Sequence, residues 1–200
     1  MVKRILTCTI AVLVSGLSLS PRTAMAQQPL VVRALAEKKI AELPTGALYW
    51  RLENFPTRAQ AEAAAGPAAL VAESGGKMWL FTLGPSGGSS ADGIKVAEVG
   101  PLPEVMATQY LLRINEASGS PGSVTTVHAH PGSEAFYVLA GEQSILTPHG
   151  IIRVSVGQPE AGPGGDTPLQ VSNSGSTELH ALVMFVVDAT KPFSSPAKLP

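Results

Sequence analysis

The stretch from Gly122 to Gly141 limits what this chain can fold into more than any other part of its sequence. It reads GSVTTVHAHPGSEAFYVLAG. Residues 124–130 alternate and are rich in β-branched side chains, which is typical of a β-strand. The Pro-Gly-Ser that follows is typical of a turn, and the run from Glu134 to Leu139 predicts a second strand. We therefore expect two short strands joined by a tight turn.

Two histidines and one glutamate fall at positions where they can meet. Strand side chains repeat with a period of two, so Thr126, His128 and His130 share one face of the first strand. On the second strand Glu134 shares a face with Phe136, which either lines a pocket or is plain core. If the strands pair as a hairpin, two imidazoles and a carboxylate come together across them. That set suits a divalent transition metal such as iron, manganese or zinc with open coordination positions.

These residues also match the motif of a known family. The spacing G-x5-H-x-H-x3-E-x6-G is the first signature of the cupins, small β-barrels of the jelly-roll type, and the sequence resembles it at every fixed position. The resemblance implies that His128, His130 and Glu134 bind a metal inside a barrel. The alternative is that both histidines are polar residues on an exposed strand and that the glutamate is a solvated charge. The fixed spacing favours the metal site over that alternative.

The second cupin signature, roughly G-x5-P-x-G-x2-H-x3-N, is where the sequence departs from the family. An alignment anchored on Thr167 and Asn173 puts Leu169 in the place of the histidine, whereas one anchored on Pro163 puts Pro168 there. The fourth ligand is missing in both alignments. The resemblance therefore implies at most a three-ligand site, with Leu169 as a further residue that lines the pocket.

The composition agrees with an all-β fold. The 200 residues include 20 Gly and 17 Pro, which favours turns and short strands over long helices. Apolar runs between residues 70 and 187 recur at about 8 to 12 residues, the pattern of a sandwich or barrel. We predict a jelly-roll cupin barrel with a short helical N-terminal extension. In this division residues 27–105 hold the extension with its helices and accessory strands, residues 106–190 the barrel core and residues 191–200 a flexible tail.

Three further segments lead to specific expectations. Residues 30–43 are charged and rich in alanine, which predicts a helix that ends at Pro44. Thr57 and Gln60 form a capping box that begins a second, short helix. The run from Leu179 to Val187 is apolar on both faces, so it is either the interior of a sandwich or a subunit contact. Because many cupins dimerise through such sheets, the resemblance implies a homodimer.

Residues 1–26 predict a signal peptide. Lys3 and Arg4 precede a mostly apolar run, and Ala24-Met25-Ala26 is a typical cleavage site. The apolar run is about 15 residues long, shorter than the roughly 20 that a membrane span needs, so we expect no stable membrane insertion after cleavage. Cleavage also removes Cys8, the single cysteine of the sequence. The mature protein is therefore expected in the periplasm or secreted.

Three other polar residues have individual interpretations. Arg113 lies among apolar residues, where it either points into the barrel and holds a substrate carboxylate by a bidentate pair or is solvated. His180 lies on a late strand and is either a replacement ligand for the metal or a surface or hydrogen-bonded histidine. His149 follows a proline and is expected in a turn. No general acid or base is identifiable beyond the predicted ligands, so no catalytic residue is assigned.

Two functions are open at this point. One is a metal-dependent enzyme in which the three predicted ligands hold Fe, Mn, Ni or Zn and a small organic molecule is the substrate. For this function the cupin resemblance implies oxygenase or isomerase activity. The other is a metal-free cupin that binds a small organic molecule without turnover. The formal net charge of −1 gives no indication of nucleic acid as a partner.

Overall fold

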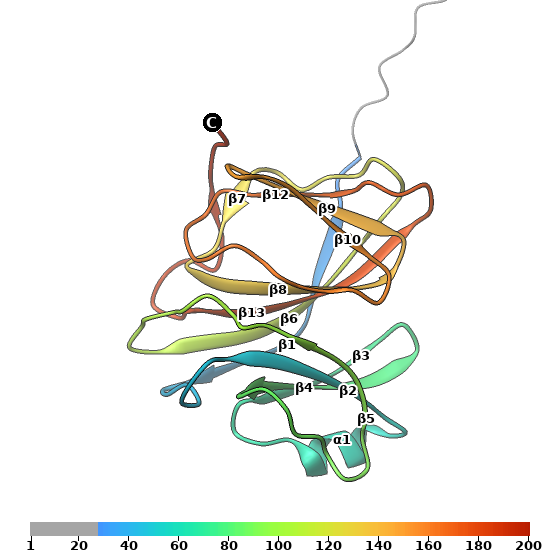
Figure 1. Ribbon diagram of the computed structural model, residues 1–200, viewed down its shortest axis with the longest axis vertical. Helices are drawn as coiled ribbons and strands as arrows, with labels where there is room; N and C mark the ends of the chain where they lie inside the picture. Colours follow the sequence, from blue (N-terminus) through green and yellow to red (C-terminus); the bar gives the residue numbers. More distant parts are fainter. Residues whose placement is uncertain (1–27) are drawn as a thin grey trace, which may run out of the picture.

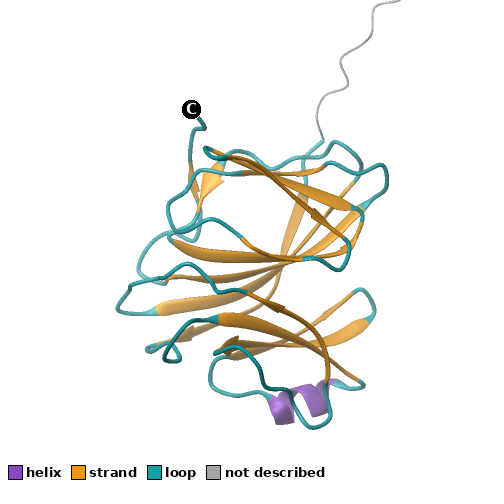
Figure 2. Ribbon diagram, viewed as in Figure 1, coloured by secondary structure: helices purple, strands orange, loops and turns teal. Residues whose placement is uncertain are grey.

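The computed structural model describes residues 28–200, which form three stacked β-sheets (Figure 1 and Figure 2). The predicted signal peptide at residues 1–26 lies outside the described residues. The strands of all three sheets pair antiparallel, in keeping with the predicted all-β jelly roll. Within the described part of the chain, no helix is long and apolar enough to cross a membrane.

The central sheet has five strands, and a smaller sheet covers each of its faces. The spatial order of the central sheet is β1 (Val31–Ile40), β6 (Tyr110–Gly119), β13 (Leu179–Asp188), β8 (Gly132–Ala140) and β11 (Pro159–Ala161). The three-stranded sheet has the order β10 (Gly150–Ser155), β9 (Glu142–Thr147) and β12 (Gln170–Asn173). The four-stranded sheet has the order β3 (Ala69–Ser74), β4 (Lys77–Gly84), β2 (Tyr49–Phe55) and β5 (Ile94–Val99). The remaining elements are the paired short strands β7 (His128–Ala129) and β14 (Ser195–Pro196), and helix α1 (Arg58–Ala64).

Two hydrophobic cores lie on opposite faces of the central sheet. Alternation along β6 shows how the sequence divides between them: Leu112 and Ile114 point toward the four-stranded sheet, whereas Arg113 points the other way. The core beneath the four-stranded sheet includes Trp50, Trp79, Phe81, Tyr137 and Met184. The core beneath the three-stranded sheet includes Phe136, Ile145, Leu169, Leu179 and Phe185.

Strand β13 is buried on both faces because it is the middle strand of the middle sheet. It pairs with β6 on one side and with β8 on the other. Met184 packs in the core beneath the four-stranded sheet, and its neighbour Phe185 packs in the other core. Of the two interpretations of residues 179–187, the sandwich interior is therefore confirmed. Since this chain covers both faces of β13 by itself, the homodimer stays a prediction without support from that strand.

The helix predicted over residues 30–43 is wrong. The segment is β1, an edge strand that pairs antiparallel with β6 over most of its length. Alanine, glutamate and lysine favour a helix locally, but the long ladder with β6 outweighs that preference. Lys38 and Lys39 are exposed on this edge strand, where charges discourage pairing with another chain. The central sheet thus takes a strand from the segment that we expected to form a separate extension.

Helix α1 begins as the capping box predicts. The Thr57 hydroxyl accepts a hydrogen bond from the Gln60 N–H at 3.3 Å and donates one to Gln60 Oε1 at 2.7 Å. The glutamine side chain therefore bonds the threonine hydroxyl instead of the threonine backbone N–H. Ala61 packs against Phe55 and Leu80, so the helix lies on the outer face of the four-stranded sheet (Figure 1).

The two strands of the Gly122–Gly141 stretch do not form the expected hairpin. Strand β7 pairs with β14, and its His128 bridges to Leu169. Strand β8 pairs with β13 and β11 in the central sheet. The chain passes from one side of the barrel to the other at Pro131, which has no N–H to donate to a ladder. The histidines and Glu134 therefore approach each other across the barrel interior and not across a pair of neighbouring strands.

Residues 191–200, expected to be a flexible tail, instead pack on the barrel. Strand β14 pairs with β7, and Ala197 N–H donates to the Val127 carbonyl at 3.2 Å. The Phe193 ring lies 5.0 Å from the Phe185 ring and 4.7 Å from the His130 ring, measured between centroids. We call residues 189–197 the C-terminal strap. Burial of the Phe193 ring in these contacts offsets the entropy cost of ordering the strap.

Candidate functional site

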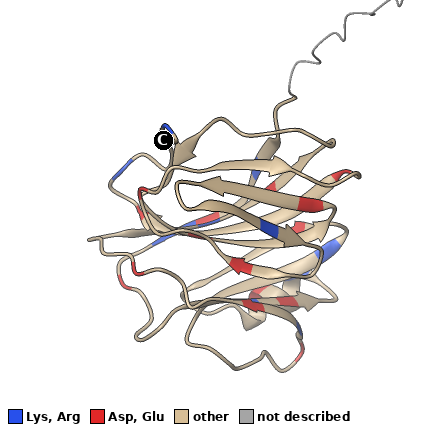
Figure 3. Cartoon of the chain, turned by 45° about the horizontal axis from the view of Figure 1, so that its top comes forward, with Lys and Arg blue, Asp and Glu red and all other residues tan. Residues whose placement is uncertain are grey.

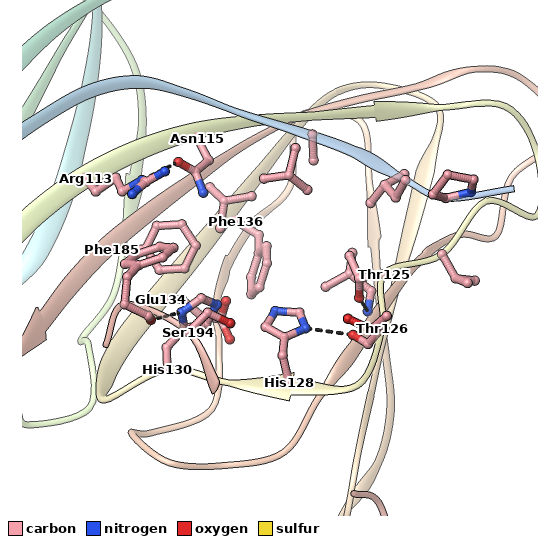
Figure 4. Close-up of a pocket in the computed structure, with 18 residues that line it drawn as sticks. Arg113, Asn115, Thr125, Thr126, His128, His130, Glu134, Phe136, Phe185 and Ser194 are labelled. Carbon is pink, nitrogen blue, oxygen red and sulfur yellow. Dashed lines mark hydrogen bonds between the residues drawn. The ribbon is translucent and has the colours of Figure 1, made fainter. Parts of the chain in front are cut away.

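A cavity of about 460 Å³ lies between the central sheet and the segments that face it (Figure 4). Its polar lining consists of Arg113, Asn115, Thr125, Thr126, His128, His130, Glu134 and Ser194. Its apolar lining consists of Pro29, Leu30, Val32, Ala117, Val124, Phe136, Val171, Val183, Phe185 and Phe193. The three predicted metal ligands thus line one cavity, together with the predicted pocket residues Thr126, Phe136 and Arg113.

The floor of the cavity is formed by alternate residues of three neighbouring strands. In the register of the ladders, Arg113 on β6 is opposite Phe185 on β13, which is opposite Glu134 on β8. The next row across the same strands is Asn115, Val183 and Phe136. Directly opposed residues of antiparallel strands point to the same face and lie in contact distance. Regular sheet pairing therefore sets the relative positions of these six side chains.

Backbone carbonyls orient both histidines of the cavity. His128 Nδ1 lies 2.8 Å from the Thr126 carbonyl oxygen, and His130 Nδ1 lies 2.6 Å from the Phe193 carbonyl oxygen. A carbonyl only accepts, so each Nδ1 carries the hydrogen and each Nε2 of the neutral ring keeps a free lone pair. The two ring centroids are 5.0 Å apart with the planes at 86°. Both rings are thus held in place, and each has one acceptor nitrogen.

Burial keeps His130 neutral. The side chain is 6% exposed, and this desolvation lowers the pKa of His130 to about 4. The hydrogen bond to the Phe193 carbonyl opposes the shift, while repulsion from His128, when that ring is protonated, and from Arg113 adds to it. His130 is therefore an uncharged imidazole throughout the physiological pH range.

Glu134 is a buried carboxyl group on the cavity floor. It is 3% exposed, and no described residue donates a hydrogen bond to its side-chain oxygens. Burial raises the pKa of Glu134 to about 8, so the group is mainly protonated at neutral pH. Gly162 closes over it: a Cβ at that position would lie 2.9 Å from Glu134 Cγ and 2.8 Å from the Phe136 ring. Only a glycine fits there without displacing the floor.

The donor chemistry of the cavity suits a divalent metal, but the spacing does not. Metal-binding histidines commonly donate their other ring N–H to a carbonyl, as His128 and His130 do. The Glu134 carboxyl group lines the same cavity and accepts no hydrogen bond from a described residue. However, among residues 28–200 no three His, Cys, Asp or Glu side chains are grouped closely enough to hold one ion. The predicted ligands share the cavity without forming a three-ligand set.

Leu169, one of the two candidates for the missing histidine position, is paired with His128 by an isolated β-bridge. The two residues are opposite partners, with His128 N–H donating to the Leu169 carbonyl at 3.0 Å and Leu169 N–H donating back at 2.8 Å. The prediction that Leu169 lines the pocket is wrong, because Leu169 is not among the residues that line the cavity. Its side chain is 1% exposed and packs in the core next to the cavity, together with Phe136 and Phe185.

His180 is too far from the cavity to replace the missing ligand. It lies on the other side of the central sheet, with Nε2 2.6 Å from Glu116 Oε1 and 3.1 Å from the Ser74 hydroxyl. Burial acts to raise the pKa of Glu116, but hydrogen bonds from Ser74, Arg33 and His180 outweigh it and lower the pKa to about 2. His180 is therefore a hydrogen-bonded structural residue. His149 lies in the turn between β9 and β10, as predicted.

Asn115 and Phe193 are two of the cavity residues that were not singled out from the sequence. Asn115 follows Arg113 by two positions and so shares its strand face, a signal that alternation alone provides. Phe193 lies in a proline-rich segment that has no strand pattern, so no sequence signal identifies it. It reaches the cavity only because the C-terminal strap pairs with β7.

No protein-family model matches the sequence, and no curated protein matches it. Solved structures with a similar fold include a cupin-like protein from Thermotoga maritima, with 15% identity and a TM-score of 0.39 over 44% of this chain and 65% of that one. A cupin domain from Bordetella pertussis has 22% identity and a TM-score of 0.33 over 38% of this chain and 80% of that one. The polyketide cyclase RemF from Streptomyces resistomycificus has 22% identity and a TM-score of 0.37 over 44% of this chain and 62% of that one.

These matches are partial. The chain covers less than two thirds of the length of two of the three proteins, and each TM-score is below 0.5.

Proposed function

We propose that this protein binds a small organic molecule in the cavity above the central sheet. The observation that carries the proposal is a preformed space of about 460 Å³, mostly apolar, with a few polar groups converging on it. Pockets for small molecules typically measure about 300 to 1,000 Å³ and have this composition. The floor belongs to a regular sheet, so its shape does not depend on a mobile loop.

The lining residues divide between contact and orientation. Phe136, Phe185 and Val183 offer flat and branched apolar surface to the body of the ligand. The Nε2 atoms of His128 and His130 accept hydrogen bonds from hydroxyl or N–H groups of the ligand. Burial of apolar surface therefore stabilises the bound ligand, and hydrogen bonds from its polar groups orient it in the cavity.

A variant that fills the cavity tests this function. Val183 is at the centre of its row on the floor, so Val183→Phe should occupy the space and weaken ligand binding at least about 10-fold, a loss of about 1.4 kcal/mol. Binding of 2-naphthoate and 2-naphthamide to the full mature protein is measured by calorimetry. Val96→Phe, on the edge strand β5, adds the same ring away from the cavity and should leave binding unchanged. Wild-type protein that binds neither probe would contradict the proposal.

A metal-dependent function of the same cavity is the second candidate. The observation that favours it is the hydrogen bonding of both Nδ1 atoms to carbonyls, which leaves the Nε2 lone pairs of His128 and His130 available in the cavity that Glu134 also lines. A bound divalent ion would supply Lewis-acid chemistry. Oxygenase or isomerase activity, expected from the cupin resemblance, belongs to this candidate. Export to the periplasm or outside the cell, and a homodimer, are further parts of the proposal.

A further inference from the structure

Arg113 is the only lysine or arginine among the described residues that line the cavity. Its guanidinium is held in place on two sides. Arg113 Nε donates to Asn115 Oδ1 at 2.9 Å, and Arg113 Cζ lies 4.3 Å from the centroid of the Phe193 ring. The arginine is therefore oriented before any ligand arrives.

Most of the hydrogen-bond donors of Arg113 remain available. A guanidinium has five N–H donors, and hydrogen bonds to described residues use the one on Nε. The one ion pair joins Nη1 to Glu37 at 3.4 Å, and the Glu37 side chain is 58% exposed. Exposed pairs of this kind contribute little free energy and exchange readily with water. Arg113 can therefore form a stronger, bidentate pair with an acceptor inside the cavity.

Asn115 adds donors of the same kind. It is 3% exposed, and its Oδ1 is already occupied by Arg113, so the amide presents its N–H groups to the cavity (Figure 4). No described residue accepts a hydrogen bond from Asn115 Nδ2. An unused amide beside an oriented guanidinium forms a patch of donors, next to which the exposed Glu37 carboxylate lies 3.4 Å from Arg113 Nη1. Such a patch recognises an anion with two oxygens in one plane.

We propose that the molecule bound here is a small organic acid whose carboxylate pairs with Arg113 and Asn115 and whose apolar body lies on Phe136 and Phe185. The inference rests on the proposed function and specifies the class of its ligand. One guanidinium matches the single charge of a carboxylate, and the apolar floor begins directly beside it, since Phe185 is opposite Arg113 in the ladder.

Two probes of equal shape separate this inference from simple binding. 2-Naphthoate carries a carboxylate, and 2-naphthamide is its uncharged counterpart. Calorimetry on the full mature protein should show about 10- to 100-fold tighter binding of the carboxylate, as expected for charge-assisted hydrogen bonds. Arg113→Met should abolish this preference. Arg153→Met, on the exposed face of β10, should retain it.

Asn115→Asp provides a second test with almost no change in shape. The new carboxylate would pair with Arg113, so it should weaken 2-naphthoate binding about 10-fold or more and affect 2-naphthamide less. Circular dichroism verifies that each variant is folded. Equal affinity of the wild type for both probes, or an unchanged preference in Asn115→Asp, overturns the inference and leaves the binding function standing. Absence of binding for both probes overturns the proposed function itself.

Discussion

Among the individual residues, Glu134 is a titratable group in an environment very different from water. Its side chain is buried on the cavity floor, and burial raises its pKa to about 8. Alternation predicts that Glu134 and Phe136 point to the same face. It does not predict the protonation state, because that depends on Gly162 and on the strands that close over the carboxyl group.

This shift predicts a pH dependence of stability. The unfolded chain ionises Glu134 near its ordinary value of 4.5, whereas the folded, metal-free protein holds the proton until about pH 8. The contribution of the protonated Glu134 side chain to the free energy of unfolding is therefore fully present below pH 4.5. It decreases above that pH and is lost as the pH rises through 8. Each unit of the shift corresponds to at most about 1.4 kcal/mol. Glu134→Gln should remove this dependence and gain about 2 to 4 kcal/mol relative to wild type between pH 5 and 8.

Urea unfolding with a chelator present, at pH 5, 6.5 and 8, provides the measurement. Glu73→Gln is a suitable control, because Glu73 is an exposed carboxylate on β3. It should follow the wild-type profile. If wild type and Glu134→Gln show parallel profiles, the carboxyl group is not buried in its neutral form.

A second prediction at this scale concerns Leu169. Leu169 is the opposite partner of His128 and packs in the core next to the cavity, so Leu169→His would place a third imidazole near His128. An additional ligand should raise the affinity for Ni(II) or Zn(II) by at least about 10-fold, the lower limit seen for changes around metal ligands. His128→Ala should abolish binding.

Tag-free protein titrated with Mn(II), Ni(II) and Zn(II) by calorimetry tests this prediction. His149→Ala, in the turn between β9 and β10, should bind metal as wild type does. A wild type that binds none of the three ions would support the metal-free function. An unchanged affinity in Leu169→His would mean that position 169 is not the ligand position.

Among the elements, the C-terminal strap connects the fold to the site. It pairs with β7, accepts the Nδ1 hydrogen bond of His130 at the Phe193 carbonyl, and places the Phe193 ring on the cavity wall. The sequence of this segment favours disorder, with proline and small residues. Pairing with β7 and aromatic contacts reverse that local preference.

Removal of the ring should therefore weaken both the fold and the site. Phe193→Ala is expected to lower the free energy of unfolding by about 1 to 3 kcal/mol, since the side chain is only half-buried, and to reduce the affinity for 2-naphthoate. Hydrogen exchange of residues 189–197 should accelerate in the same variant. Lys198→Ala, which removes an exposed side chain directly after the strap, serves as the control. Wild-type exchange that is already fast would show that the strap does not pack in solution.

For the whole molecule, the two cores on either side of the central sheet differ in how they are filled. Trp50, Trp79 and Phe81 fill the core beneath the four-stranded sheet, whereas the core beneath the three-stranded sheet leaves the cavity at one end. The four-stranded sheet thus supports the central sheet from behind, and the barrel side is free to bind. Acidic and basic residues are interspersed over the described part of the chain (Figure 3), and the formal net charge of the full sequence is −1.

Export is the prediction that concerns the whole chain. The basic residues Lys3 and Arg4, the apolar run and the Ala24-Met25-Ala26 motif predict cleavage after Ala26 and a mature protein that begins at Gln27. Fractionation of the native host followed by N-terminal sequencing measures both location and start. Replacing Ala24 and Ala26 by Leu should leave the precursor uncleaved. A mature protein that retains Met1 in the cytoplasm would contradict the prediction.

The sequence by itself determined the all-β class, the helix cap at Thr57 and the sharing of one face by Thr126, His128 and His130. These are local properties, since side-chain alternation and capping depend on residues a few positions apart. Only the tertiary structure decided that residues 31–40 form a strand, that β7 and β8 lie in different sheets, and that Phe193 closes the cavity. Those outcomes depend on ladders and contacts between residues far apart in the chain, whose free energy outweighs local propensity.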